Sequence, residues 1–189
     1  MTALALGRPQ ASGRGRLALA LLLGALVAVA LGVYGRVHDP TGRSLVTLFF
    51  TATINLKVWL ATAAFALAIL QVLTAAKFYG KLGEGRGPRW LGRAHRASGT
   101  LAFLLIIPVA YHCLWALGFQ VQGDARVLAH GMLGCVFFGT LSAKVLLVRS
   151  GGLPGWALPV AGGTLFSALI AVWLTSAFWY FTNVTFPGF

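Results

Sequence analysis

Five long apolar runs constrain this chain more than any other feature, because each is long enough to cross a lipid bilayer. A helix needs roughly 20 consecutive apolar residues to span the hydrocarbon core. Backbone groups in lipid must be paired within their own segment, and the runs lack the alternation of a membrane β-barrel, so each run predicts a helix. The predicted spans are residues 17–35, 56–76, 97–119, 127–148 and 157–181.

The composition excludes a soluble globular protein and a disordered one. Of 189 residues, 58% are hydrophobic and 10% are charged, whereas a soluble domain carries roughly 25% charged residues and disordered segments are poor in apolar residues. The net charge of +12 does not indicate nucleic-acid binding, because it reflects the scarcity of acids, which are only Asp39, Glu84 and Asp124. We therefore predict an all-α integral membrane bundle of five helices in a lipid bilayer.

The distribution of Lys and Arg predicts the orientation of the bundle. With the N-terminus inside, eleven of these residues fall on the inner side and four on the outer side, as the positive-inside rule requires. The chain is then a multi-pass protein of the plasma membrane with a disordered basic tail (1–15), a membrane domain (16–182) and a short outer tail (183–189). The outer set is Arg36, Arg43, Lys57 and Arg126; the inner set is Arg8, Arg14, Arg16, Lys77, Lys81, Arg86, Arg89, Arg93, Arg96, Lys144 and Arg149.

Two segments of this topology have further interpretations. Arg14, Arg16, an apolar core and Ala28-Val29-Ala30 resemble a cleavable signal peptide, but the apolar run continues through Tyr34, which favours an uncleaved span. The stretch 45–53 is predicted to be an interfacial lead-in to the second span. Lys57 is expected to extend outward toward the membrane surface.

Histidines are the residues of the spans that point to chemistry. No Asp or Glu lies inside any span, which argues against a proton-coupled carrier. His112 in the third span and His130 in the fourth lie at similar depth, and a short loop predicts that the two helices are antiparallel neighbours. Two imidazoles facing each other across a bundle core are what a six-coordinate haem iron requires.

Glycines one turn after two of the histidines fit the same interpretation. Gly134 follows His130, and Gly99 follows His95, each at the i+4 position on the same helix face. A missing side chain there leaves room for the edge of a porphyrin. The alternative is that these glycines only permit close packing of helices in lipid.

His95 suggests a second haem near the inner side. It lies 17 residues, about 25 Å of helix, from His112, and Arg93, Arg96 or Lys144 are candidates to pair with the haem propionates. No other inner histidine exists to supply a second axial ligand. Alternatively, His95 is a solvated residue of a basic loop, and Lys144 extends to the surface.

The remaining chemical residues have several interpretations. Cys113 and Cys135 fall in the outer halves of neighbouring helices, where a disulfide or a copper or zinc site with the histidines is conceivable, although Cys113 points about 100° away from His112. Pro108 is expected to kink the third helix. Tyr111 and Trp115 either line a cofactor pocket or face lipid, and His38 is a loop residue that caps the outer haem, binds a partner, or is simply exposed.

The segments 94–119 and 128–149 resemble an uncharacterised actinobacterial family of small polytopic membrane proteins. Its genes often lie beside those of Rieske iron–sulfur proteins, so the resemblance implies a redox partner. More loosely, histidines paired across antiparallel helices look like the membrane b-type cytochromes, including the ascorbate-reducing and ferric-reductase groups. Those proteins use four histidines for two haems, whereas this chain offers one pair and one lone inner histidine.

The sequence therefore predicts a membrane b-type cytochrome that acts as an electron-transfer subunit and binds one or two haem b groups. Quinol or a cytoplasmic donor would supply electrons, and a partner at the outer face would accept them. The protein would provide axial ligands, a dry pocket and cations for the propionates, while the redox chemistry belongs to the haem. The competing hypothesis is a cofactor-free structural or assembly subunit of a membrane complex.

Overall fold

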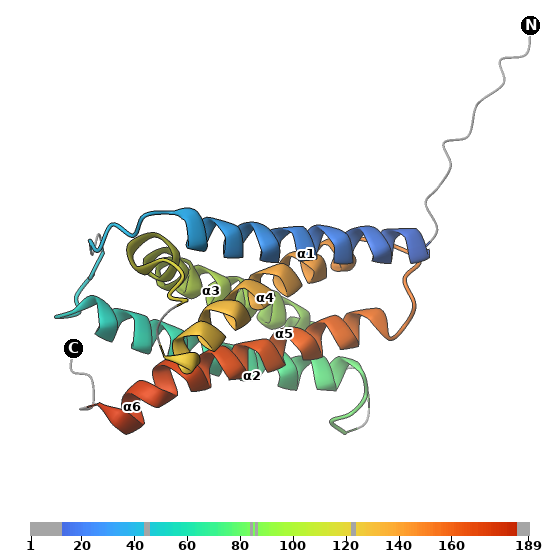
Figure 1. Cartoon of the computed structure of the whole chain (residues 1–189). Coiled ribbons are helices and arrows are strands. Elements are labelled where there is room, and N and C mark those ends of the chain that lie inside the picture. Colours follow the sequence, from blue (N-terminus) through green and yellow to red (C-terminus); the bar gives the residue numbers. More distant parts are fainter. Residues whose placement is uncertain (1–12, 44–45, 84, 86, 122–123, 185–189) are drawn as a thin grey trace, which may run out of the picture.

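The computed structural model describes residues 13–43, 46–83, 85, 87–121 and 124–184, and every regular element in these ranges is helical. The helices run alternately in opposite directions along one bundle (Figure 1). The elements are α1 (Gly13–Val37), α2 (Thr53–Phe78), α3 (Trp90–Tyr111), the π-helix η1 (His112–Leu117), α4 (Ala125–Val148), α5 (Ala157–Trp173), the π-helix η2 (Leu174–Phe178) and α6 (Trp179–Asn183).

In the part of the chain that the structure describes, five helical segments are long and apolar enough to cross a membrane. The third combines α3 with η1, and the fifth combines α5, η2 and α6. Only 11% to 22% of the most apolar window of each segment is buried within the protein, so most of its side chains face outward. Such a surface is unfavourable in water at about 25 cal/mol per Å² of apolar area, but it suits lipid. The prediction of an all-α bundle with five membrane helices is confirmed.

The two ends of the bundle differ in charge. The basic end carries the start of α1, the end of α2, the start of α3 and the connection 149–156, whereas the opposite end carries the end of α1, the start of α2, the end of η1 and the end of α6 (Figure 1). At the basic end, the Arg16 guanidinium donates a 2.8 Å hydrogen bond to the carbonyl of Gly151 and so links α1 to the α4–α5 connection.

The helices pack in an order that differs from the predicted one. α4 packs along α1 and α5, and α2 packs along α3. Among the described residues, α3 and α4 do not pack closely against each other, so the expectation that they are direct neighbours is wrong. A short connection requires only that two helix ends meet, and here the rest of α3 follows α2 instead.

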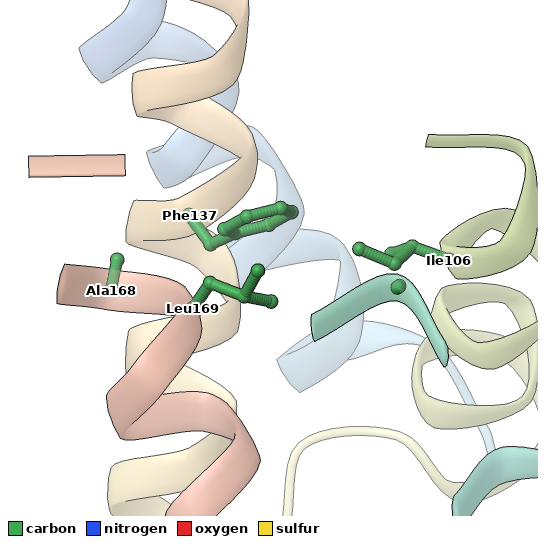
Figure 2. Packing of buried hydrophobic residues seen from close by; sticks show 5 residues of the cluster. Ile106, Phe137, Ala168 and Leu169 are labelled. Atoms are coloured by element: carbon green, nitrogen blue, oxygen red, sulfur yellow. The ribbon is translucent and has the colours of Figure 1, made fainter. Parts of the chain in front are cut away.

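A small apolar cluster joins four of the helices at mid-height. Phe137 of α4 and Leu169 of α5 lie side by side, and Ile106 of α3 lies across from them (Figure 2). Ala64 of α2 and Ala168 of α5 complete this cluster. At this level, side chains of α3 and α4 belong to one apolar cluster.

Two helix boundaries differ from the sequence predictions. α1 already begins at Gly13, within the predicted tail, while the tail's residues 1–12 and residues 185–189 lie outside the described ranges. The third span ends at Leu117 instead of residue 119, because Gly118 takes a φ of +64° that closes the turn. A side chain at Gly118 would lie 2.8 Å from the ring of Pro40, so glycine also permits this close approach.

Candidate functional site

Two cavities lie one above the other inside the bundle, on either side of the Ile106, Phe137 and Leu169 cluster. We name each by its histidine. The His130 cavity has a volume of about 450 Å³, and the His95 cavity has a volume of about 510 Å³. Ile106, Phe137 and Leu169 line both cavities and therefore form the partition between them. Both volumes fall within the roughly 300–1,000 Å³ typical of small-molecule and cofactor sites.

The His130 cavity is flanked by both π-helices. Cys113, Leu114 and Leu117 line it from η1, and Thr175, Ser176 and Ala177 line it from η2. A π-helix is rare, and single π turns occur frequently at functional sites, where the wider turn redirects side chains. The π turn of η1 starts four residues after Pro108, which lies inside α3.

His130 is held at one ring nitrogen by η2 and the end of α5. Its Nδ1 lies 3.3 Å from both the Val172 carbonyl and the Thr175 hydroxyl. That hydroxyl already donates to the Ala171 carbonyl at 2.7 Å, so it accepts from His130. The neutral imidazole therefore carries its hydrogen on Nδ1 and keeps its lone pair on Nε2, which is the form that binds a metal.

Lys57 and Cys113 lie beside His130 in the same cavity. The Cys113 thiol is next to both the His130 imidazole and the Lys57 amine, and all three side chains line the cavity. Lys57 sits near the start of α2 and is only partly exposed. The expectation that it extends outward to the membrane surface is therefore wrong, because its amine lies beside the Cys113 thiol at the cavity wall.

His95 has the same tautomer as His130 and lines the other cavity. Its Nδ1 lies 2.6 Å from the Thr74 hydroxyl, and that hydroxyl donates to the Leu70 carbonyl at 2.8 Å. Nδ1 is therefore the donor, and Nε2 keeps its lone pair. Gln71 steadies this turn of α3 by donating to the His95 carbonyl and, at 2.7 Å, to the Ser98 hydroxyl.

His112 is buried away from both linings. Only 1% of its surface is exposed, and Nδ1 donates to the Pro108 carbonyl at 2.7 Å. Its Nε2 has no hydrogen-bond partner among the described residues. Leaving a buried polar group unpaired costs roughly 1–3 kcal/mol. His112 is thus a third histidine with an available Nε2, but it does not line the His130 cavity.

The spacing of residues along each helix explains which of them line the cavities. His95 and Cys113 are 18 residues apart, which is five full turns at 3.6 residues per turn, so both lie on one face of α3. His130 and Lys144 are 14 residues apart, close to four turns, so they share a face of α4. The facing pairs are Cys113 with His130 in one cavity and His95 with Lys144 in the other.

The two glycines predicted to make room for a ring differ in their surroundings. A Cβ placed on Gly134 would meet nothing within 4 Å, and Gly134 lines the His130 cavity. A Cβ on Gly99 would lie 3.1 Å from the amide oxygen of Gln71. Gly99 lines the His95 cavity, but its missing side chain also accommodates Gln71. Gly162 and Gly163 of α5 open the same cavity, and neither would place a Cβ within 4 Å of another group.

The three cations expected near His95 are placed differently. Lys144 lines the His95 cavity, whereas Arg93 and Arg96 are exposed and do not contribute to its lining. Arg96 is still close enough to act electrostatically on His95, although less strongly than Lys144. Lys144 is therefore the cation that the fold turns toward the cavity.

Two cysteines singled out in the sequence line the His130 cavity, whereas His38, Tyr111 and Trp115 lie outside both linings. Cys113 and Cys135 are both free cysteines and are not joined to each other. His38 stacks on Tyr34 with ring centroids 5.0 Å apart, and its Nε2 lies 3.2 Å from the Trp115 carbonyl, so it carries its hydrogen on Nε2, unlike the three span histidines. Tyr111 stacks on Trp115 in the same aromatic group. Among the described residues, no group of three or more His, Cys, Asp or Glu is arranged to hold a metal ion by itself.

Comparison with known proteins identifies the family. Residues 17–188 match a family of unknown function, DUF6529, and the chain belongs to this family. Neither the curated proteins nor the solved structures contain a match. The family description assigns no activity, so the function has to be argued from the cavities and the residues on their walls.

Proposed function

We propose that this protein is a membrane b-type cytochrome that carries electrons through haem held between α3 and α4. The observation that carries the proposal is the state of the span histidines. His95 and His130 stand on the walls of separate cavities, and each has Nδ1 hydrogen-bonded and keeps its lone pair on Nε2, which in His130 lies beside the Cys113 thiol. Histidines that ligate metals commonly have the other ring nitrogen fixed in this way. A bound haem would supply a one-electron ferric–ferrous couple.

The residues around each cavity suit a porphyrin. Both walls are mainly apolar, which favours a flat hydrophobic ring, and Gly134, Gly162 and Gly163 add no side-chain bulk. Among the described residues, α3 and α4 are not closely packed and residues of both line each cavity, so the space between them is open to a planar group. His130 is the first candidate ligand in its cavity. Cys113 on the facing wall and the neighbouring His112, whose Nε2 is unpaired, are the candidates for the second position.

The electron path follows from the stacking of the cavities. A donor at the basic end, quinol or a soluble protein, would give one electron at a time to the His95 cavity, and the same electron would pass to the His130 cavity. A partner at the opposite end would take it, and an iron–sulfur protein of the Rieske type fits that role.

The basic end faces the cytoplasm in this proposal, because Lys and Arg gather there. A reporter inserted at Gly85 should be active only inside the cell and one fused after Phe189 only outside; the reverse result would refute the orientation.

The decisive experiment is the visible spectrum of the purified full-length protein. Reduction by dithionite should give the α-band of a low-spin b-type haem. His130→Ala should remove at least half of the bound haem, because it deletes the only histidine on the wall of its cavity. His38→Ala is the matched control, since His38 holds its hydrogen on the other nitrogen and lies outside both linings.

Two further variants identify the second ligand beside His130. If His112 is the second ligand, His112→Ala should turn the haem in the His130 cavity high-spin, while Cys113→Ser should leave it low-spin. If Cys113 is the second ligand, Cys113→Ser should turn that haem high-spin, while His112→Ala should leave it low-spin. A well-folded protein without any haem absorbance would refute the cytochrome proposal and favour a structural subunit that packs through its small residues.

A further inference from the structure

We propose that Lys144 is the second axial ligand of a haem in the His95 cavity, facing His95 from the opposite wall. This inference rests on the proposed function and supplies the ligand for which no second inner histidine exists. It depends on the placement of two residues from α3 and α4, and on the environment that the fold gives to the lysine.

The first argument is geometric. His95 and Lys144 both line the cavity of about 510 Å³, one from α3 and the other from α4. Lys144 lies close enough to His95 for the charges of the two side chains to interact. The two helices are not closely packed in this part of the bundle, so their facing side chains can hold a group between them.

The second argument concerns the charge of the lysine. No Asp or Glu lies in any of the five spans, and no hydrogen bond or ion pair to the Lys144 amine is found in the described part of the chain. An ionised amine inside a membrane bundle normally has a partner. Lys144 is therefore suited either to lose its proton and use its lone pair, or to pair with an anion that comes with a ligand.

The chemistry of the opposite wall favours the first of these roles. Thr74 fixes His95 so that its Nε2 lone pair is available for one side of a metal. A neutral amine provides the same kind of nitrogen lone pair for the other side. When Lys144 ligates, its ammonium releases one proton, and the nitrogen lone pair forms the bond to iron. The α4 helix ends at Val148, one turn further on, so the released proton leaves toward the basic end.

Two other roles for Lys144 make different predictions. As an ammonium ion it would pair with a haem propionate, and charge alone would matter. As a snorkelling residue it would reach the surface, since about 6 Å of helix separates it from the end of α4. Arginine keeps the charge but has no lone pair to give, whereas histidine keeps a ligand nitrogen but is ordinarily neutral. These two substitutions separate ligation from charge pairing.

The experiment measures haem per chain and the spin state of the iron in the full-length protein purified with haem. Wild type should hold two low-spin haems. Lys144→Arg should turn one of them high-spin or reduce the content from two haems to one, and Lys144→His should restore two low-spin haems. Lys77→Arg is the matched control, because Lys77 is a lysine in the last turn of α2 that lines neither cavity, and it should leave both haems unchanged. Size-exclusion profiles and helical circular dichroism establish that each variant is folded.

Each alternative outcome overturns the inference in a recognisable way. Two low-spin haems in Lys144→Arg, but not in Lys144→Leu, would make Lys144 a propionate partner, because leucine has neither a charge nor a ligand atom. Two low-spin haems in both variants would make it a surface residue. A single haem in wild type that depends on His130 and not on His95 would refute the second site while leaving the cytochrome proposal intact. A wild-type protein without haem would refute the proposed function itself.

Discussion

The two sides of α4 use glycine in opposite ways. Toward α1, a Cβ on Gly139 would lie 2.5 Å from the Gly24 carbonyl oxygen and 2.8 Å from the Ala28 methyl group, so the two backbones touch. Toward α3, a Cβ on Gly134 would meet nothing within 4 Å. We call the first side the α1–α4 seam and the second the cavity side. The same residue type closes one face of the helix and opens the other.

This difference shows where the helices of the bundle are closely packed and where they are not. Helices in lipid gain little from hydrophobic burial against each other, so their association depends on close packing of small residues. The α1–α4 seam has such packing, with Gly24 and Gly139 at its centre and Ala28 and Ala143 beside them. The cavity side lacks it, because α3 stands off from α4 over both cavities. Under the proposed function, a bound flat cofactor would provide the packing on the cavity side.

The largest effect is expected from breaking the seam. Gly139→Ala places a methyl group 2.5 Å from a backbone oxygen of α1, so the helices must separate along their contact. Overpacking of this kind costs about 1–3 kcal/mol, which exceeds the gain of up to about 1 kcal/mol from replacing a helical glycine by alanine. Thermal unfolding in detergent should show a midpoint several degrees below that of wild type.

Gly24→Ala tests the seam from its other helix. Its methyl group would lie 2.6 Å from the Gly139 carbonyl oxygen, so the loss of stability should be similar. If either variant unfolds at the wild-type temperature or above it, the close contact between α1 and α4 is not what holds the seam together.

The fold was largely predictable from the sequence, because span length and the absence of span carboxylates are local properties. Apolar runs of about 20 residues are sufficient to predict the five helices. The lateral arrangement was not predictable, since short connections specify which helix ends meet but not which helix lies along which. The positions of Gly24 and Gly139 in the seam become evident only when α1 is placed against α4.

The sequence was sufficient to single out most of the residues of the candidate site, but not to predict which of them share a cavity. His95, His130 and Lys144, which the sequence analysis singled out, all line cavities. The residue of the third span that lines the cavity with His130, however, is Cys113 and not the preceding residue, His112. Rotation about the axis of α3 depends on its packing along α2 and on the π turn at its end. One signal in the sequence could have indicated the arrangement. The 18-residue spacing of His95 and Cys113 matches five turns, whereas the 17 residues to His112 do not.

The smallest effect, of opposite sign, is expected on the cavity side of the same helix. Gly134→Ala adds a methyl group where no neighbour lies within 4 Å, so no clash offsets the better helix propensity of alanine. The protein without cofactor should therefore unfold at the wild-type temperature or slightly above it. The gain in the free energy of unfolding should be at most about 1 kcal/mol.

With haem present, the methyl group projects into the His130 cavity and should weaken haem retention there without affecting the His95 cavity. Gly134 and Gly139 are five residues apart on α4, so the same substitution made at both sites separates the effect of helix propensity from that of packing. A loss of stability at Gly134 as large as that at Gly139 would mean that the cavity side is closed in solution.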